Sequence, residues 1–182
     1  MDEPQTRAAK RAATGGRILD AAQVEFGDHG FEGTTVRGIA ARAGVDPSLV
    51  IQHYGSKADL FAIAIRLDPE TTDEEVASHL FDVLGVRLEG LPPETRALLR
   101  SMLTVPQATA AMKEFLDERV ANLARTSSAD DGELRATLAV CSILGLTIGK
   151  HFLGLEALAD VSESQLEEIV RPWLAATIGD AQ

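Results

Sequence analysis

The chain has 182 residues, of which 45% are apolar and 25% are charged, and it contains one cysteine. This composition is ordinary for a folded protein, and it excludes a disulfide framework and any metal site built from several cysteines. The N-terminus lacks an apolar stretch of the signal-peptide type, and the most apolar run, from Leu138 to Gly149, is shorter than the ~20 residues that a membrane span needs. We therefore expect a cytoplasmic protein with no membrane partner.

Charge is divided unevenly along the chain. Residues 1–67 hold 8 Lys or Arg and 8 Asp or Glu, whereas residues 68–182 hold 9 Lys or Arg and 20 Asp or Glu. The net charge of −11 therefore belongs to the second part. A neutral N-terminal part can still bind phosphate groups through a few placed cations, so the acidic total does not exclude a nucleic-acid partner.

The N-terminal part of the chain predicts a loose arm followed by a helix. The arm covers residues 1–14, is rich in alanine and carries the cations Arg7, Lys10 and Arg11. These cations either enter a minor groove of DNA or belong to a disordered tail, and the tail is the favoured interpretation. Apolar spacing predicts the helix from about 17 to 29, with Gly30 as its left-handed stop.

Local capping signals predict three more helices in the next 30 residues. Thr34 and Thr35 supply hydroxyls ahead of a helix at 36–43, and Asp46-Pro47 starts a helix at 47–54. Ser56, with an aspartate three residues later, predicts a capping box at the start of a fourth helix.

The rest of the chain predicts longer helices near 72–88, 93–104, 106–125, 131–157 and 163–178, with a kink at Pro172 in the last. In the helix at 131–157, apolar residues recur at alternating spacings of 4 and 3, as along a coiled-coil seam. A second apolar stripe indicates that one face packs within the subunit and the other against a partner. The predicted dimer interface comprises Leu138, Cys141, Gly145, Ile148, Phe152, Val170, Trp173 and Thr177.

Residues 35–54 have the spacing of a helix-turn-helix, in which the second helix enters the major groove of DNA. The second helix is 47–54, and we expect it to turn Ser48 and Gln52 outward, with Leu49 beside them. Glutamine pairs with adenine, serine with either base type, and apolar groups with the thymine methyl. Hydroxyls and cations around this helix suit phosphate, and Lys57 at the start of the fourth helix suits it best. The predicted DNA-binding residues are Thr34, Thr35, Arg37, Pro47, Ser48, Leu49, Gln52, His53, Tyr54 and Lys57.

Residues 15–65 resemble the DNA-binding region of the TetR family of bacterial transcriptional regulators. The resemblance rests on an ordered set of strings, among them Phe26-Gly27-Asp28-His29-Gly30-Phe31, Ile39-Ala40-Ala41-Arg42-Ala43-Gly44-Val45 and His53-Tyr54-Gly55-Ser56-Lys57. One departure is Ile51, because many members carry at this position a tyrosine that contacts phosphate.

The resemblance implies an all-α homodimer. An N-terminal three-helix domain at 15–66 would contain the helix-turn-helix, and a helical domain at 67–182 would bind a ligand and dimerise. A small-molecule effector in the second domain would release the protein from a double-stranded DNA operator, which makes repression the expected outcome.

Other kinds of site have weaker signals. No His, Asp or Glu cluster has metal-ligand spacing, and no nucleophile or phosphate-cradling motif indicates an enzyme, so we expect no metal and no cofactor. Met102, Phe115 and Phe152 are candidates for the ligand pocket, although such residues at helical spacing usually belong to a core. Two alternatives stay open: a helical interaction protein with a degenerate DNA-binding head, and a DNA binder that responds to no ligand.

Overall fold

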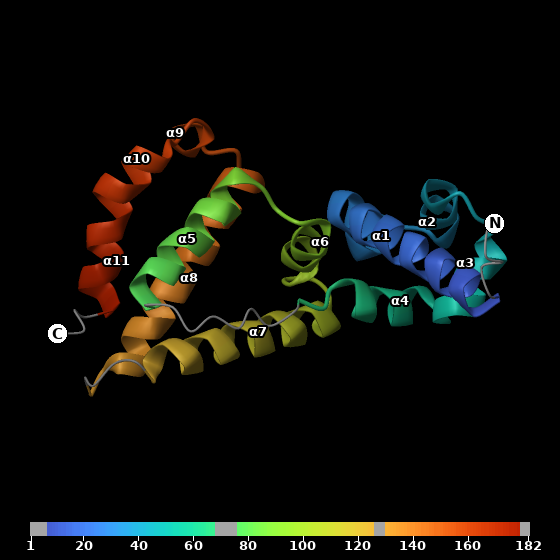
Figure 1. Ribbon diagram of the computed structural model, residues 1–182, viewed down its shortest axis with the longest axis horizontal. Coiled ribbons are helices and arrows are strands. Elements are labelled where there is room, and N and C mark those ends of the chain that lie inside the picture. Colours follow the sequence, from blue (N-terminus) through green and yellow to red (C-terminus); the bar gives the residue numbers. More distant parts are fainter. Residues whose placement is uncertain (1–6, 68–75, 126–129, 179–182) are drawn as a thin grey trace, which may run out of the picture. The chain divides into compact units, whose positions relative to one another are not determined.

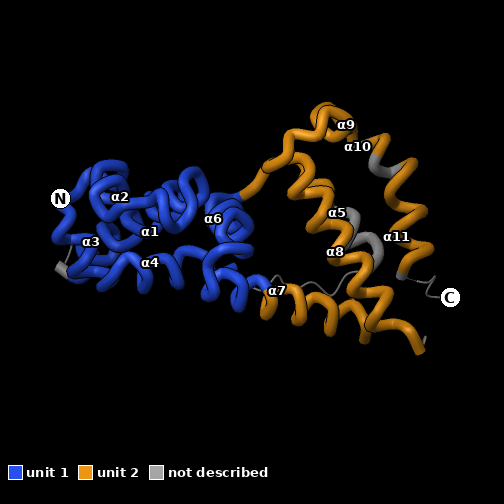
Figure 2. Tube along the Cα trace, turned by 180° about the vertical axis from the view of Figure 1, so that it is seen from behind, with its two compact units in different colours: residues 1–68, 92–112 blue, residues 69–91, 113–182 orange. Residues whose placement is uncertain are grey.

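The computed structural model describes residues 7–67, 76–125 and 130–178, and in these ranges the regular structure is helical throughout. The all-α class predicted from the sequence is confirmed. The chain divides into two compact units (Figure 2). The first comprises residues 1–68 and 92–112, and the second comprises residues 69–91 and 113–182. The first unit thus contains more than the predicted domain at 15–66, because a later segment of the chain joins it.

The first unit contains the N-terminal helices and that later segment (Figure 1). Its helices are α1 Arg7–Gly33, α2 Val36–Ala43, α3 Pro47–Tyr54, α4 Lys57–Ala64, α6 Pro93–Ser101 and the first part of α7 Pro106–Ala124. The bounds of α2 and α3 confirm the prediction, and the predicted capping box between Ser56 and Asp59 at the start of α4 is present.

Helix α1 starts earlier than predicted. The loose arm is wrong for residues 7–14, which form the first turns of α1, and residues 1–6 of that arm lie outside the described residues. Alanine is the strongest helix former, and four alanines here outweigh the two glycines at 15 and 16. The other end is as predicted, because Gly30 has a φ of 70°, which ends the regular helix.

Three aromatic rings form the centre of the first unit. Phe26 and Phe61 are fully buried, with ring centroids 4.9 Å apart in an edge-to-face arrangement. Phe31 follows the kink at Gly30 and places its ring centroid 4.9 Å from that of Phe61. The chain therefore folds back after Gly30, and the Phe31 ring joins α1 to α4.

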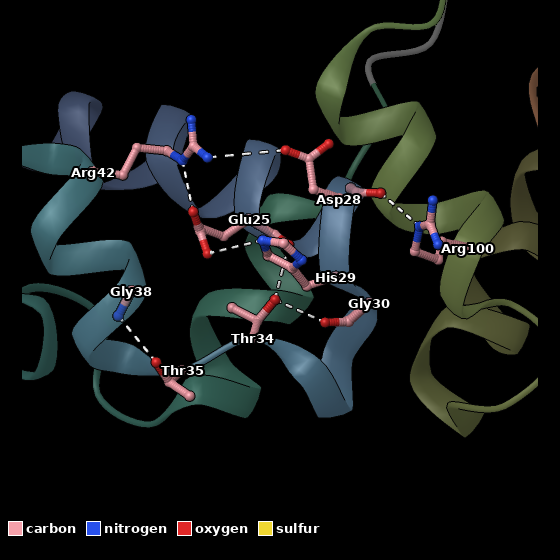
Figure 3. A network of polar contacts seen from close by, with 10 residues as sticks. Glu25, Asp28, His29, Gly30, Thr34, Thr35, Gly38, Arg42 and Arg100 are labelled. Carbon is pink, nitrogen blue, oxygen red and sulfur yellow. Dashed lines mark hydrogen bonds and ion pairs between the residues drawn. The ribbon is translucent and has the colours of Figure 1, made fainter.

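Helix α6 packs closely on α1 within the same unit. Arg100 Nε donates a hydrogen bond of 2.7 Å to the backbone oxygen of Gly27 (Figure 3). Gly27 is buried, and a Cβ atom at this position would lie 3.3 Å from both Pro93 O and Arg96 Cδ. The absence of a side chain at Gly27 therefore permits the close approach of the two helices.

The second unit contains the remaining helices. They are α5 Val76–Glu89, the rest of α7, α8 Gly132–His151, α9 Glu156–Ala159, α10 Glu163–Gln165 and α11 Arg171–Ile178. The predicted helix at 131–157 is wrong beyond His151, because the chain turns at Gly154 and starts the short α9. Residues 72–75 of the helix predicted at 72–88 lie outside the described residues.

Helix α8 supplies the core of the second unit. Ala139 and Val140 are buried with Leu174 of α11. One turn later, Ile143 is buried with Leu84 of α5 in a second cluster. One face of α8 therefore packs within the subunit, as the second apolar stripe predicted.

The chain changes its winding directly before α11. Residues Leu166–Val170 form a π-helical turn, and Pro172 follows as the second residue of α11. Proline has no N–H, and its ring crowds the preceding turn of an α-helix. The wider turn gives the ring space. The kink expected at Pro172 therefore takes the form of a π-turn that precedes it.

Helix α8 is the one helix in the described ranges that is long and apolar enough to cross a membrane. Core helices of soluble proteins meet the same length and composition criterion, and this helix buries its inner face on α7, α5 and α11. The helix is longer than the uncharged run from Leu138 to Gly149, because Glu133 and Arg135 precede that run and Lys150 follows it.

Candidate nucleic-acid interface

Local contacts fix the turn between α2 and α3. Thr35 Oγ1 accepts a hydrogen bond of 3.0 Å from Gly38 N and so caps α2. Gly44, with φ 64° and ψ 42°, ends α2 in the left-handed region that favours glycine. Asp46 Oδ1 then accepts a hydrogen bond of 2.8 Å from Ser48 N and caps α3. The α2–turn–α3 segment is therefore a helix-turn-helix with defined ends.

Helix α3 buries one side and exposes the other. Val50 is only 1% exposed and anchors the inner side. Ser48, Ile51 and Gln52 are exposed, and their spacing of 3 and 4 residues from Ser48 places them on one side of the helix. We call these three residues the outer face of α3. It offers an amide, a hydroxyl oxygen and an apolar group, which are the chemistries that read base edges.

The outer face differs from the prediction in its apolar member. Leu49, expected beside Ser48 and Gln52, is half-buried, whereas Ile51 is 48% exposed. The hydroxyl of Ser48 donates a hydrogen bond of 2.6 Å to Asp46 Oδ1, so it faces any further partner as an acceptor. The same contact, with the Ser48 backbone N–H, lowers the pKa of Asp46.

The end of α3 is held against α1. Tyr54 Oη donates a hydrogen bond of 2.8 Å to the backbone oxygen of Gly15. Burial raises the pKa of Tyr54, and the Asp20 carboxylate raises it further. A Cβ atom on Gly15 would lie 3.4 Å from both Tyr54 Oη and His53 Nδ1, so the glycine permits this approach. The DNA contacts predicted for His53 and Tyr54 stay predictions, and both residues also position α3.

The predicted phosphate contact of the Thr34 hydroxyl is wrong. Thr34 is only 1% exposed, and its Oγ1 lies 2.8 Å from the backbone oxygen of Gly30 and 2.9 Å from that of Glu25, which share its single proton (Figure 3). It therefore satisfies carbonyls at the end of α1, whereas its neighbour Thr35 caps α2. The sequence does not distinguish the two adjacent threonines. The structure does, because the Thr34 side chain is buried and that of Thr35 is exposed.

Lys57 makes its polar contacts within the first unit. Its Nζ donates to the backbone oxygens of Phe31 at 2.8 Å and Thr34 at 3.1 Å, and it lies 4.3 Å from the centre of the Phe31 ring. These contacts hold the link between α1 and α2 to the start of α4. An ammonium group has three N–H donors, so one remains for the predicted phosphate contact.

The two arginines of α2 differ in their partners. Arg42 Nε lies 2.7 Å from Glu25 Oε1, and its Nη2 lies 3.9 Å from Asp28 Oδ2 (Figure 3). The charge of Arg42 is thus largely offset by α1. Arg37 is exposed, and among the described residues it makes no ion pair. Arg37 is therefore the α2 cation that suits phosphate.

Four of the eight predicted dimer-interface residues are exposed on the second unit, and the other four are half-buried. Leu138 is 52% exposed and Trp173 is 44% exposed, and Cys141 and Gly145 are also exposed. Ile148, Phe152 and Thr177 are half-buried. Val170 instead packs against the core, and its neighbour Ile169 is 67% exposed. Ile169 is therefore an outward residue that the sequence pattern missed.

The residues suggested for a ligand pocket belong to different units. Met102 is buried in the first unit, and Phe115 and Phe152 are half-buried in the second. The guanidinium carbon of Arg119 lies 3.3 Å from the centre of the Phe115 ring. Across the described ranges, no group of three or more His, Cys, Asp or Glu side chains is arranged to hold a metal ion.

Comparison with known proteins gives matches along most of the chain. A family model described as bacterial regulatory proteins of the tetR family matches residues 18–64. A second model, described as the C-terminal domain of tetracyclin repressor-like proteins, matches residues 70–178. The first match contains the helix-turn-helix, and the second contains α5 to α11.

Individual relatives agree with these matches. The HTH-type transcriptional repressor AcnR of Corynebacterium efficiens is 31% identical over 135 residues, which is 68% of this chain and 70% of the relative. The HTH-type transcriptional regulator BetI of Rhizobium meliloti is 27% identical, with 91% of each chain covered. A crystal structure of a transcriptional regulator from Rhodococcus sp. Rha1 has a TM-score of 0.68 at 23% identity, covering 90% of this chain and 95% of that one. That similarity shows a shared fold.

Proposed function

Because the chain belongs to the TetR family of bacterial transcriptional regulators and is a DNA-binding regulator, we propose that it acts in the cytoplasm as a homodimeric repressor. A small molecule releases it from its operator, and it catalyses no reaction. The observation that carries this proposal is the exposed outer face of α3 on a helix-turn-helix whose other side is buried. The name of AcnR, a 31% identical relative, supports the repressor role.

DNA recognition follows from the chemistry around α3. Gln52 on the outer face can form paired hydrogen bonds with adenine in the major groove. Thr35, Arg37 and the third N–H of Lys57 supply donors for the phosphates that flank the groove. In a twofold dimer, two copies of α3 meet half-sites about one helical turn, ~34 Å, apart, so the operator is a near-palindrome.

The dimer forms through the exposed apolar residues of α8 and α11. Leu138 and Trp173 are large and about half exposed in the single chain, and the small exposed residues Cys141 and Gly145 follow Leu138 at intervals of about one turn along α8. Small residues at a helix surface permit the close approach of a second helix. Burial of apolar surface against a partner is favourable by about 25 cal/mol per Å². Continuous packing of these residues therefore favours association of two copies.

Substitution of Gly145 by glutamate tests this interface. A Cβ atom at Gly145 meets nothing within 4 Å in the single chain, so the subunit itself accommodates the change. We expect Gly145→Glu to yield folded monomers in sedimentation velocity, because it places a charge in the apolar contact. Gly85→Glu is the matched control, since a Cβ atom there also meets nothing within 4 Å. A Gly145→Glu protein that remains dimeric would place the interface elsewhere.

Effector release follows from the family of the chain, and the second unit offers two half-buried aromatic side chains, Phe115 and Phe152, as candidates for the pocket. Met102 belongs to the first unit and is not placed with them. A screen of small molecules for release of a fluorescent operator tests it. A regulator that no tested compound releases would favour a DNA binder that responds to no ligand.

The main experiment is selection of binding sites from a library of randomised duplexes. We expect the wild-type protein to enrich a near-palindrome. Gln52→Ala should lose base preference at one position in each half-site, with a loss of about 1–3 kcal/mol there. Gln107→Ala is the matched control, because Gln107 is an exposed glutamine on α7 of the same unit. Unchanged base preference in Gln52→Ala would refute its assignment, and no enrichment by the wild type would refute DNA recognition.

A further inference from the structure

The first turns of α1 carry positive charge in a chain that is acidic as a whole. Residues 7–19 contain four Lys or Arg and no Asp or Glu, although the net charge of the chain is −11. Lys10, Arg11 and Arg17 are exposed, and none of them takes part in the ion pairs of the described residues. The described part of the subunit therefore leaves these charges available to a partner.

Gly15 brings this segment to the DNA-reading helix. The hydrogen bond from Tyr54 Oη to Gly15 O, at 2.8 Å, joins α1 to the end of α3. In Figure 1 the N-terminal end of α1 lies beside α3. Arg11 precedes Gly15 by four residues, so it lies one turn further along α1 on the side that faces α3. Lys10 is adjacent to Arg11 in the sequence and lies at nearly the same level, about 100° further around the helix.

The reach of this segment matches the dimensions of DNA. An α-helix rises about 1.5 Å per residue, so Arg11 lies about 6 Å beyond Gly15 along α1, and its long side chain adds to that reach. The major groove is about 12 Å wide, and phosphates border it on both sides. With α3 in the groove, a helix that crosses its end and continues outward meets one of the two bordering strands.

We propose that the N-terminal turns of α1 are a second DNA-binding element, in which Arg11 and Lys10 bind backbone phosphates beside the groove that α3 occupies. This inference rests on the proposed recognition of DNA by α3. The element contributes affinity without base preference, because phosphates carry no sequence information. Helical structure through Ala8, Ala9, Ala12 and Ala13 holds the two cations in place before DNA arrives.

The salt dependence of binding tests this element directly. Each phosphate contact contributes about 0.9 to the slope of log affinity against log salt concentration. With the duplex selected by the wild-type protein, Arg11→Ala should lower the magnitude of the slope by about 0.9 per subunit and leave base preference unchanged. Arg66→Ala is the matched control, because Arg66 is an exposed arginine that follows α4 in the same unit. A slope for Arg11→Ala equal to that of Arg66→Ala would overturn the proposal.

A second variant separates a placed helix from a charged tail. Ala12→Pro keeps both cations but breaks the helix between Arg11 and Gly15. We expect it to reduce the slope as Arg11→Ala does, with the rest of the protein folded by circular dichroism. Wild-type affinity and slope in Ala12→Pro would overturn the role of helical placement. A wild-type protein with no sequence preference at any salt concentration would instead overturn the proposed function, which keeps the two failures distinct.

A different observation assigns a role to Ile51. This β-branched apolar residue is 48% exposed on the outer face of α3, one turn after Ser48 and next to Gln52 in the sequence. Its exposed part packs on nothing that the structure describes. The thymine 5-methyl group is the apolar feature of the major groove. We infer that Ile51 contacts a thymine methyl and selects thymine over cytosine at one position in each half-site.

Deoxyuridine provides the test, because it lacks only that methyl group. In the selected duplex, replacement of the contacted thymine by deoxyuridine should weaken wild-type binding about fourfold, which corresponds to ~0.8 kcal/mol for a buried methyl group. The same replacement should have no further effect on Ile51→Ala. Ile63→Ala, a change of an exposed isoleucine on α4, should retain the full wild-type effect. An equal effect of deoxyuridine on the wild type and Ile51→Ala at every thymine would overturn the assignment.

Discussion

Replacement of Lys57 by methionine tests whether this residue has a structural role that is independent of DNA. Methionine keeps an unbranched side chain of similar length but removes the ammonium group. The variant loses the hydrogen bonds to Phe31 O at 2.8 Å and Thr34 O at 3.1 Å, together with the contact between Nζ and the Phe31 ring at 4.3 Å. The two backbone carbonyls, one at the end of α1 and one in the link to α2, then lose a charged donor.

The size of the effect follows from these contacts. Hydrogen bonds from charged donors are worth about 1.5–3 kcal/mol each, and a cation–π contact at an exposed site is worth about 0.5–1 kcal/mol. Lys57 is half-buried, so the values at the low end apply, and the retained side-chain stem offsets part of the loss. We expect Lys57→Met to lower the free energy of unfolding by about 2–3 kcal/mol.

Urea denaturation without DNA, followed by circular dichroism, measures this loss. Lys113→Met is the control, because Lys113 is an exposed lysine whose ion pair is with Asp117 one turn later. Its substitution should lower the free energy of unfolding by only about 0.3–0.5 kcal/mol. A Lys57→Met protein as stable as Lys113→Met would refute the structural role and leave phosphate binding as the reason for a lysine at this position.

Three further substitutions test packing and capping. Gly27→Val should lower the unfolding free energy by about 1–3 kcal/mol, since a Cβ atom there meets Pro93 O at 3.3 Å. Gly16→Val should change it little, because a Cβ atom at Gly16 meets nothing within 4 Å. Equal thermal melts of the two variants would contradict the close approach of α1 and α6. Ser101→Ala should raise stability by about 1 kcal/mol in the same assay, because its buried hydroxyl has no hydrogen-bond partner among the described residues, and a loss would reveal one. Hydrogen bonds from Ser56 lower the pKa of Asp59, so the stabilisation of α4 by this carboxylate is complete above about pH 4 and is lost as the pH falls further. Asp59→Asn should remove this pH dependence in acid titrations of helicity. An unchanged titration would contradict the role of Asp59.

The helix-turn-helix was predictable because its boundaries are determined locally. Thr35, Asp46 and Ser56 each accept a hydrogen bond from a backbone N–H two or three residues later, so neighbours in the sequence determine where α2, α3 and α4 begin. Gly30 interrupts α1 with a φ of 70°, and Gly44 ends α2 in the left-handed region, both for a local reason. Such signals depend on a few adjacent residues, and a single sequence displays them.

The site was less predictable where contacts join distant parts of the chain. The buried Thr34 hydroxyl contacts backbone oxygens of α1. Lys57 Nζ donates hydrogen bonds to backbone oxygens 26 and 23 residues earlier in the chain. The early start of α1 has another cause, because a pair of glycines predicts a break that alanine-rich neighbours override. Which apolar residue of α3 faces outward depends on packing against α1 and α2, and so Ile51 was recognised only as a departure from the family.

In the second unit, periodicity predicted the helices better than their ends. The inner stripe of α8 is buried and Leu138 and Trp173 are exposed, as the two-sided pattern indicated. The helix nevertheless stops at His151, and the chain turns at Gly154. The prediction ran past this end because apolar residues continue at helical spacing beyond the turn. A pattern of apolar positions shows which face of a helix packs, but it does not determine the last residue.

Fluorescence anisotropy with two labelled duplexes tests the central claim, sequence-specific binding through α3, most directly. The first duplex is the sequence enriched by the wild-type protein, and the second has the same base composition in scrambled order. The account predicts tight binding of the wild type to the enriched duplex alone, weakening steeply between about 50 and 200 mM salt, and reduced discrimination by Gln52→Ala. Equal affinity of the wild-type protein for both duplexes at each salt concentration would contradict it.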